Sequence, residues 1–404
     1  MIITSERTVS FLITKEEVAI ALNSMKPYKV SGPYGFQCIF FKQYCHIVGM
    51  IIFNLIKSTF HACFSYRALS DTLISIILKV EPPTTYKQFR LISLCNIVYK
   101  VITKVLVHRL RLILDTIIGP YQSSFLPGRG TYDNVTVLKE IIHFTRRSKN
   151  KKGYAAFKLD LEKSFDNVNL DFLKSTLQDF RQGVTSSIFT ILWNGNKMPP
   201  FKPTHGLRQG DPLSPYLFIL CMEKLSISIN KVVLQGNWEP IHIINSGPKL
   251  FHLLYADDIL LFSKARNSQL RLISNLFDRF SHASRLKINL SKSRSFYSSG
   301  IPQAKINKLK SISGIRSTIS LDKYLGFLIL KGRAKKNDFY FIIEKMQTRL
   351  TSGKNILLNK PGRLTLLSSV LSSIPSYYMQ ISWFPQSICE NIDQTTRNFI
   401  WRYK

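Results

Sequence analysis

The chain has 404 residues, 45% of them apolar, which is enough for a large buried core and roughly two or three domains. Its 56 lysines and arginines outnumber 24 aspartates and glutamates, giving a net charge of +32 at pH 7. This excess predicts a polyanionic partner, either nucleic acid or an anionic membrane surface. The N-terminus lacks a signal-peptide layout, and the apolar run 47–56 is too short to span a bilayer. We therefore expect a soluble intracellular protein with no membrane partner.

Cysteine and histidine usage argues against a zinc site. The six cysteines are scattered without a Cys-x-x-Cys pair, and the eight histidines are equally dispersed. Structural thiols in a reducing compartment are expected.

The N-terminal third is predicted to be mainly helical. Thr14 is an N-cap candidate with Glu17 three residues later, the spacing of a capping box for a helix over 14–25. Further along, we expect one or two helices over 36–64, a strand over 73–78 that ends in Lys79, and a basic helix over 96–114.

The middle of the chain alternates helices and strands. After a loop over 122–130 the pattern predicts a helix to about residue 144 and a strand over 154–159, with Asp160 at its end. The next expected elements are a helix over 169–180, a strand over 188–193 with a hairpin signal at Asn194-Gly195, a loop over 206–215 and an apolar helix over 216–229.

Two adjacent acids divide the apolar segment 251–262. The runs on either side of Asp257 and Asp258 read as buried strands, so the acids are expected at or beside a hairpin tip. The remaining expected elements are a helix over 268–283, a strand or hairpin over 324–329 and a basic helical region over 339–404.

A second strand also ends in an acid, because Asp160 follows the strand over 154–159. Ionised carboxylates are unfavourable in an apolar setting unless a cation meets them. Acids at the ends of neighbouring strands suit Mg²⁺, which prefers oxygen ligands. A two-metal site of this kind stabilises both the attacking and the leaving oxygens of phosphoryl transfer. A solvated turn is the alternative for an Asp-Asp pair considered alone.

Three ordered motifs carry a family resemblance. They are Lys158-Leu159-Asp160-Leu161-Glu162-Lys163-Ser164-Phe165-Asp166, then the segment from Gly206 to Pro215 that contains Arg208-Gln209-Gly210-Asp211, then Tyr255-Ala256-Asp257-Asp258. In this order they closely resemble the palm motifs of reverse transcriptases, most closely those of plant LINE-type (non-LTR) retrotransposons. Further similar blocks cover nearly the whole chain, so the ordered set is specific.

The resemblance implies an α+β right-hand polymerase with fingers, palm and thumb, and an antiparallel palm sheet packed by helices. Residues 1–130 would form an N-terminal extension and fingers, 131–335 the palm with interleaved finger elements, and 336–404 a truncated thumb-like region. It implies RNA-directed DNA synthesis, with an RNA template, a DNA primer or target DNA, and dNTPs as partners. Nuclear localisation is expected on the same basis.

The resemblance also implies roles for individual residues. Asp160, Asp257 and Asp258 would be catalytic and would bind two Mg²⁺ ions, with Mn²⁺ as a substitute. Lys292 would protonate the leaving pyrophosphate. The nucleotide would contact Lys79, Arg90, Phe165, Gln209 and Gly210, with the Phe165 ring excluding a 2′-hydroxyl. Tyr324, Leu325 and Gly326 would form the primer grip. Plain structural roles remain open for Lys79, Arg90, Lys292, Phe165 and the primer-grip hairpin.

The sequence departs from the family in two ways that bear on activity. Leu91 replaces a proline after Arg90, and proline would fix the backbone there. After residue 183 roughly a dozen family residues, including a helix that packs under the palm sheet, are missing, and their loss would expose apolar surface. The alternative function is therefore a truncated, catalytically weak or dead remnant that only binds nucleic acid. An intron-maturase-like protein shares the palm but would carry a splicing-associated extension that is not recognised here.

Overall fold

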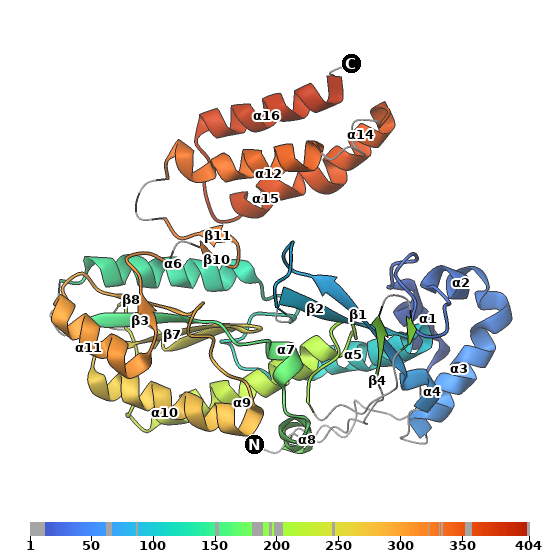
Figure 1. Ribbon diagram of the computed structural model, residues 1–404, viewed down its shortest axis with the longest axis horizontal. Coiled ribbons are helices and arrows are strands. Elements are labelled where there is room, and N and C mark those ends of the chain that lie inside the picture. The colour runs from blue at the N-terminus through green and yellow to red at the C-terminus, as the bar shows by residue number, and fades with distance from the viewer. Residues whose placement is uncertain are drawn as a thin grey trace.

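A computed structural model describes residues 13–401 apart from 62–66, 86–87, 150–152, 180–188, 194–195, 198–204, 245–246, 322, 331, 333 and 352–357. Figure 1 shows helices at both ends of the chain and two separate sheets between them. The residues around the expected gap after residue 183 lie outside the described part, as do the hairpin residues 194 and 195.

The N-terminal helices pack on one another as the sequence predicts. They are α1 (Lys15–Asn23), α2 (Cys38–Gln43), α3 (Cys45–His61), the short α4 (Arg67–Ser70) and the long α5 (Ile97–Ile117). The capping box of α1 is confirmed, because Glu17 N donates to Thr14 Oγ1 at 3.2 Å and Thr14 N donates to Glu17 Oε2 at 3.1 Å. Glu17 also forms a 2.7 Å ion pair with Arg109, which ties α1 to α5.

The first sheet has four strands in the order β2-β1-β4-β5. Strand β1 (Thr72–Leu78) runs antiparallel to β2 (Phe89–Cys95) and parallel to β4 (Phe189–Trp193). Strand β4 pairs antiparallel with β5 (Asn196–Lys197), which confirms the predicted hairpin.

The second sheet has five strands in the order β6-β7-β3-β8-β9. They are β6 (His252–Tyr255), β7 (Asp258–Lys264), β3 (Tyr154–Leu159), β8 (Arg294–Tyr297) and β9 (Arg316–Ser317). The first four are mutually antiparallel, as expected, but β9 runs parallel to β8 and makes the sheet mixed. Neither β8 nor β9 is among the elements expected from the sequence.

Helices cover both faces of the second sheet because the side chains of its strands alternate. In β3, Phe157 and Leu159 join one core while Ala156 joins the other. The first core is formed with α8 (Leu170–Asp179), α9 (Ser214–Leu234), α10 (Asn267–Ser284) and α11 (Gln303–Ser313). The second is formed with α6 (Thr131–Arg147) and the C-terminal elements, on the opposite face (Figure 1).

The C-terminal region begins with a hairpin of β10 (Lys323–Tyr324) and β11 (Phe327–Leu328) that packs on α6. The helical elements that follow are η2 (Lys336–Phe339), α12 (Tyr340–Leu350), α14 (Lys360–Leu366), a π-helical turn η3 (Leu367–Leu371), α15 (Ser373–Met379) and α16 (Gln386–Trp401). Among the helices described, none combines the length and apolar character needed to cross a bilayer.

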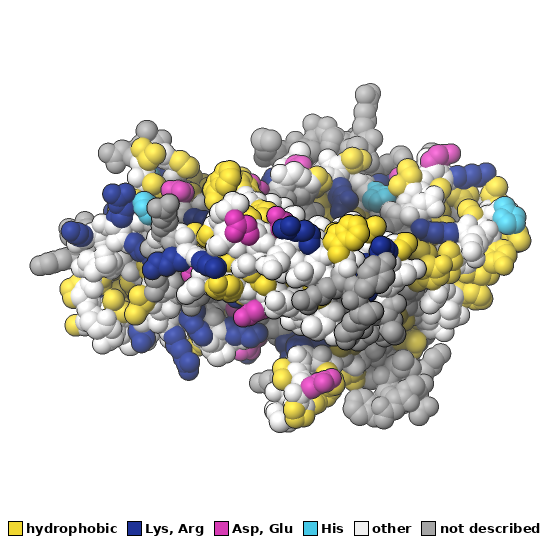
Figure 2. Space-filling model, turned by 90° about the horizontal axis from the view of Figure 1, so that it is seen from above, with side chains coloured by type: hydrophobic (Ala, Val, Ile, Leu, Met, Phe, Trp, Pro, Cys, Tyr) yellow, Lys and Arg dark blue, Asp and Glu magenta, His cyan; other side chains and the backbone are white. Residues whose placement is uncertain are grey.

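The surface is chemically uneven. Figure 2 shows Lys and Arg side chains gathered toward the end of the molecule that holds the second sheet, and hydrophobic side chains toward the N-terminal helices. Ile47, Met50 and Ile51 of α3 contribute to the exposed apolar surface at that end.

Candidate active site

The two-acid segment forms a tight hairpin. Tyr255 pairs with Asp258, so Ala256 and Asp257 are the two tip residues and Asp258 begins β7. Ala256 has a φ of 51°, a left-handed backbone conformation that is unfavourable for a residue with a Cβ. Two-residue hairpins favour a positive φ at their first tip position because it matches the twist of the strands. The turn therefore places Asp257 at the end of the sheet and Asp258 at the start of a strand.

Buried polar groups hold the tip in this conformation. The backbone N–H of Ala256 donates to Ser124 Oγ at 2.8 Å and to Gln122 Oε1 at 3.2 Å. Ser124 Oγ donates to Gln122 Oε1 at 2.8 Å, and Asn134 Nδ2 donates to the Leu254 carbonyl at 2.9 Å. Gln122, Ser124 and Asn134 are all buried. The 122–124 loop and α6 therefore fix the backbone of the hairpin that carries the two acids.

Asp160 lies beside this hairpin. Leu159 and Ile259 form the last residue pair between β3 and β7. Asp160 follows Leu159 and Asp258 precedes Ile259, so both strands have an acid at this end of the sheet. The backbone N–H of Asp160 donates to Ser293 Oγ at 3.2 Å, and its carbonyl accepts from Asn289 N at 2.8 Å. The 289–293 segment thus fixes Asp160 and brings Lys292 next to it.

Asp257 has a partner from a third element. The hydroxyl of Ser164, at the start of α7 (Ser164–Asn167), donates to Asp257 Oδ2 at 3.0 Å. Ser164 follows Lys163, whose φ of 42° turns the chain sharply after β3. The first palm-like motif therefore contacts the third directly.

The three acids act on one another electrostatically. Burial raises the pKa of Asp258 to about 6, and the charges of Asp257 and Asp160 add to the rise against the opposing charge of Lys158. Burial also raises the pKa of Asp160, with Asp257 adding to the rise and Lys292 opposing it. Carboxylates that repel in a partly desolvated site are stabilised by a bound cation.

The donor set fits a hard divalent cation. Carboxylate oxygens are the ligands that Mg²⁺ prefers, and it commonly takes one or two of them together with substrate phosphates. Within the described residues, no three Asp, Glu, His or Cys side chains are already grouped as a metal cage. The three acids fit an Mg²⁺ ion that also binds substrate phosphates.

Several cationic side chains act on Lys79, which follows β1. Partial desolvation and the neighbouring charges of Lys163 and Arg90 lower the pKa of Lys79, while Asp166 opposes this effect and Lys292 contributes to it. Arg90 lies opposite Ile77 in the β1–β2 ribbon, with an exposed side chain. Lys79 is therefore within electrostatic range of Arg90 and Lys292, and Lys292 is within range of Asp160, although the roles of these cations remain predictions.

Phe165 lies between the site and the core. Its ring stacks on that of Phe218 in α9, with centroids 4.8 Å apart and planes tilted by 17°. Its carbonyl accepts from Leu207 N at 2.7 Å, and the side chain is only partly buried. The ring is thus rigidly positioned, whether it packs the core alone or also contacts a sugar.

The 206–215 loop connects β2 of the first sheet to α7 and the residue that follows it. Gly206 N donates to the Val168 carbonyl at 2.8 Å, and the Gln209 carbonyl accepts from Ser93 N at 2.7 Å. Gly210 has a φ of 128°, and a Cβ there would lie 2.6 Å from the Ser93 carbonyl oxygen. Glycine is therefore required by contact with β2, and the predicted nucleotide role of Gln209 and Gly210 stays untested.

Two side chains of the same loop form buried contacts that were not predicted from the sequence. Tyr99 donates its hydroxyl proton to Asp211 Oδ2 at 3.2 Å, and the Arg208 guanidinium lies 4.6 Å from the Tyr99 ring centroid. Burial raises the pKa of Asp211, and the positive charge of Arg208 opposes this rise. Arg208 and Asp211 thus connect the loop to α5.

The predicted primer-grip residues form the tip of the β10–β11 hairpin. Leu325 and Gly326 have φ values of 48° and 85°, as a type I′ turn requires, and Tyr324 is fully buried. Lys158 Nζ donates to the Lys323 carbonyl at 3.0 Å and lies 5.7 Å from the Tyr324 ring centroid. Since Lys158 also influences Asp160 and Asp258, it connects this hairpin to the acids.

Several residues that support the site were missed from the sequence. Ser164, Lys158, Gln122 and Ser124 were not assigned roles, although each lies inside or beside a motif. The signal available for Lys158 was a lysine inside an otherwise apolar strand.

Comparisons with known proteins assign the chain to a family. Residues 77–329 match the family described as reverse transcriptase (RNA-dependent DNA polymerase). A 149 kDa protein of transposon TX1 from Xenopus laevis is 27% identical over 406 aligned residues, which cover 96% of this chain and 30% of that protein. The Pol polyprotein of a type-2 retrotransposable element from Drosophila melanogaster is 29% identical over 350 aligned residues, 82% of this chain and 31% of the polyprotein.

A third relative is an uncharacterized mitochondrial protein of Arabidopsis thaliana, 46% identical over 76 residues, which are 19% of this chain and 62% of that protein. The chain spans about a third of the length of the first two relatives. The family match covers more than half of the chain and includes every acid of the site. The chain therefore belongs to the reverse transcriptase (RNA-dependent DNA polymerase) family.

Proposed function

We propose that this chain catalyses RNA-directed DNA synthesis in the replication of a non-LTR retroelement. The observation that carries the proposal is the meeting of Asp160 and Asp258 at adjacent strand ends, with Asp257 at the hairpin tip between β6 and β7. An RNA template, a DNA primer or target DNA, and dNTPs would be its substrates. The net charge of +32 supports a nucleic-acid partner.

The fold elements suit a right-hand polymerase. The N-terminal helices and the first sheet would form the fingers, within residues 1–130 but with β4 and β5 contributed later in the chain. The second sheet and its helices, within 131–335, would form the palm, and 336–404 the thumb. This division is supported by the 206–215 loop, which would transmit movement between fingers and palm through its contact with Ser93.

Two divalent ions, when bound, would activate the primer hydroxyl and neutralise charge on the triphosphate. Asp160 and Asp257 would hold them, with Asp258 as the third acid. Ser164 would orient Asp257, and Ser293 would fix the backbone of Asp160. Lys79 and Arg90 would bind the triphosphate, and Lys292 would supply the proton for the leaving pyrophosphate.

The nucleotide and primer would be positioned by residues on either side of the acids. Phe165, held by Phe218, would exclude a ribose 2′-hydroxyl. Gln209 and Gly210 would seat the nucleotide against the template. Tyr324, Leu325 and Gly326 would hold the primer end, since Tyr377 Oη donates to the Leu325 carbonyl at 2.7 Å and fixes the turn.

The test is primer extension on a poly(A)–oligo(dT) substrate with Mg²⁺, using the whole chain. We expect dTTP incorporation by the natural sequence and none by Asp257→Asn, with template–primer affinity nearly unchanged in the variant. Binding without extension by the natural sequence would favour the alternative of a nucleic-acid-binding remnant. Loss of binding in Asp257→Asn would contradict the catalytic role of this acid.

Sugar selectivity gives a second, independent measurement. Phe165→Val should admit ribonucleotides, measured as the ratio of UTP to dTTP incorporation. Phe172→Leu is the matched control, because Phe172 is a partly buried ring of α8 that packs on Phe280 and not on Phe165 or Phe218. Equal sugar ratios in Phe165→Val and the natural sequence would assign Phe165 to the core alone.

A further inference from the structure

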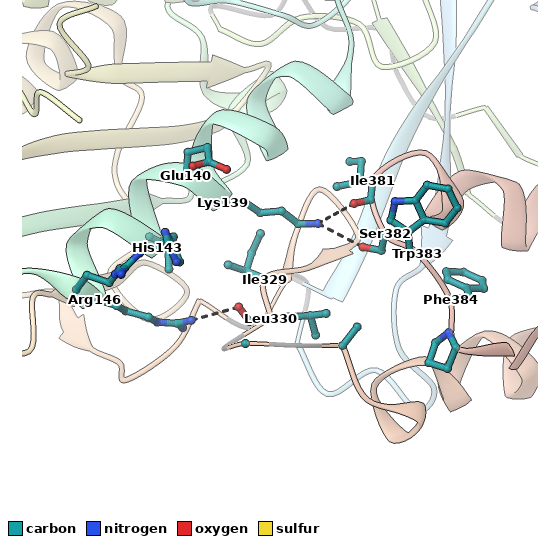
Figure 3. Close-up of a pocket in the computed structure, with 15 residues that line it drawn as sticks. Lys139, Glu140, His143, Arg146, Ile329, Leu330, Ile381, Ser382, Trp383 and Phe384 are labelled. Atoms are coloured by element: carbon teal, nitrogen blue, oxygen red, sulfur yellow. Dashed lines mark hydrogen bonds between the residues drawn. The ribbon is translucent and has the colours of Figure 1, made fainter. Parts of the chain in front are cut away.

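A second basic site lies away from the acids. A pocket of about 1130 Å³ opens between α6, residues 329, 330, 332 and 334 after β11, and residues 381–385 between α15 and α16. Figure 3 shows Lys139, His143 and Arg146 of α6 on one side and Ser382, Trp383 and Phe384 on the other. Pockets that bind small ligands commonly measure about 300–1,000 Å³. This pocket is therefore large enough to hold part of an oligonucleotide.

The pocket extends along α6 from Lys139 to Arg147, away from the end of the helix that contacts the two-acid hairpin. Asn134, in the first turn of α6, contacts Leu254 next to the two-acid tip. Phe144, near the other end of α6, packs its ring 5.2 Å from that of Tyr154, which begins β3. A helix rises 1.5 Å per residue, so Arg147 lies roughly 20 Å along α6 from Asn134. A ligand here would not occupy the space around the acids.

One face of α6 supplies positive charge to the pocket. Lys139, His143, Arg146 and Arg147 recur at helical spacing and all line it, whereas Glu140 is the acid among the lining residues described. His143 and Arg147 are exposed. Such a surface attracts phosphate groups.

Lys139 and Arg146 also hold the opposite walls in place. Lys139 Nζ donates to the Ile381 carbonyl at 3.2 Å and to Ser382 Oγ at 3.3 Å. Arg146 Nη1 donates to the Leu330 carbonyl at 3.2 Å (Figure 3). The two walls are therefore fixed relative to α6 before any ligand binds.

Trp383 provides an exposed aromatic surface at the pocket. Its side chain is 95% exposed, although its neighbours are anchored: Ser382 by Lys139, and Phe384 by ring contact with Phe339 at 4.7 Å. An indole held in water by ordered neighbours is preorganised for stacking, which lowers the entropy lost on binding. Aromatic rings beside a cationic groove are the usual elements of single-strand binding.

We propose that this pocket binds single-stranded nucleic acid, with a base stacked on Trp383 and adjacent phosphates at His143 and Arg147. The inference goes beyond the proposed polymerase activity and does not depend on it. A single strand is favoured over a duplex because the indole offers its face to an unpaired base. Its function would be to retain one strand while the polymerase site holds another.

The experiment measures fluorescence anisotropy of a labelled U₁₂ oligonucleotide with the whole chain, in the presence of saturating unlabelled primer–template duplex. We expect residual binding that Trp383→Ala weakens about tenfold or more, as loss of one stacked base predicts. Trp401→Ala is the matched control, because Trp401 is also exposed but lies on α16 outside the pocket. It should bind like the natural sequence.

Salt dependence tests the phosphate contacts separately. Arg147→Ala should reduce the slope of log affinity against log salt by about 0.7, the value for one phosphate contact on a single strand. Lys308 is an exposed cation on α11, outside the pocket. Lys308→Ala should leave unchanged the slope measured for the oligonucleotide in the presence of saturating duplex.

Three outcomes would overturn the proposal. The first is complete displacement of the oligonucleotide by duplex, and the second is equal affinity of Trp383→Ala and Trp401→Ala. The third is Trp383-dependent binding of an acidic, aromatic peptide such as Glu-Glu-Trp-Glu-Glu with no such binding of U₁₂, which would make the pocket a protein-docking site. These readouts are independent of dTTP incorporation, so failure here is distinguishable from failure of the polymerase proposal.

Discussion

The hydroxyl of Ser164 donates a 3.0 Å hydrogen bond to Asp257 Oδ2 and so connects α7 to the two-acid hairpin. A hydrogen bond to a charged group contributes about 1.5–3 kcal/mol. Ser164→Ala should therefore leave Asp257 less well oriented and slow primer extension about tenfold, with the deficit largest at limiting Mg²⁺.

The measurement is the extension rate over a Mg²⁺ titration. Ser175→Ala, at an exposed serine of α8, is the control and should behave like the natural sequence. A natural rate for Ser164→Ala at limiting Mg²⁺ would show that the hydrogen bond does not orient the acid.

The N–H of Ala256 has two buried acceptors, Ser124 Oγ and Gln122 Oε1. If one acceptor is removed, the N–H can still donate to the other. If both acceptors are removed, a buried donor is left unsatisfied, at a penalty of about 1–3 kcal/mol. The free energies of unfolding of Ser124→Ala, Gln122→Met and the double variant should therefore be non-additive, with the double variant losing at least about 0.5 kcal/mol more than the sum. Urea denaturation gives the three values, and simple additivity would mean that the acceptors work independently.

The local elements could be predicted from the sequence, whereas the contacts between distant elements could not. Strand β3 and its terminal Asp160 follow from alternation and burial within one short segment, and the α1 capping box follows from two residues. The packing of Ser164 on Asp257 joins residues far apart in the chain. No local pattern encodes such a contact, so it emerged only with the fold.

The family resemblance accounted for part of the rest. It gave the order of motifs and the expected meeting of the acids, but it did not identify β8 and β9, whose short strands have weak alternation. It also did not identify Trp383 as an exposed residue, because exposure of an aromatic depends on how the α15–α16 connection meets α6. Side-chain partners set by tertiary packing therefore remain the part that sequence patterns do not specify.

Gly210 tests the contact between the 206–215 loop and β2. A Cβ at this position would lie 2.6 Å from the Ser93 carbonyl oxygen, and its φ of 128° is unfavourable for any other residue. Gly236 also has a positive φ, of 75°, but a Cβ there would have no neighbour within 4 Å. Gly210→Ala should therefore destabilise the protein by at least about 1–2 kcal/mol more than Gly236→Ala, since both carry backbone strain and only one carries a clash. Equal losses in urea denaturation would contradict the close approach.

Glu223 predicts a pH dependence of stability that is separate from the catalytic acids. It is buried in α9, and burial raises its pKa to about 7, against opposing effects of the Gly119 backbone, Arg129 and Ser226. A carboxyl whose folded pKa lies above its unfolded value of 4.5 stabilises the fold only while protonated. Its contribution is therefore complete below about pH 4.5 and is lost as the pH rises through about 7.

Glu223→Gln keeps the shape of the protonated acid but does not titrate. Relative to the natural sequence, its free energy of unfolding should rise between pH 5 and pH 8 by up to about 3 kcal/mol, because one pKa unit corresponds to about 1.4 kcal/mol. Urea denaturation at several pH values measures the difference, with Glu140→Gln at an exposed position of α6 as the baseline. A difference between Glu223→Gln and the natural sequence that stays constant across this range would mean that Glu223 is solvated or paired in the folded state, and the buried arrangement with Gly119 and Ser226 would then be wrong.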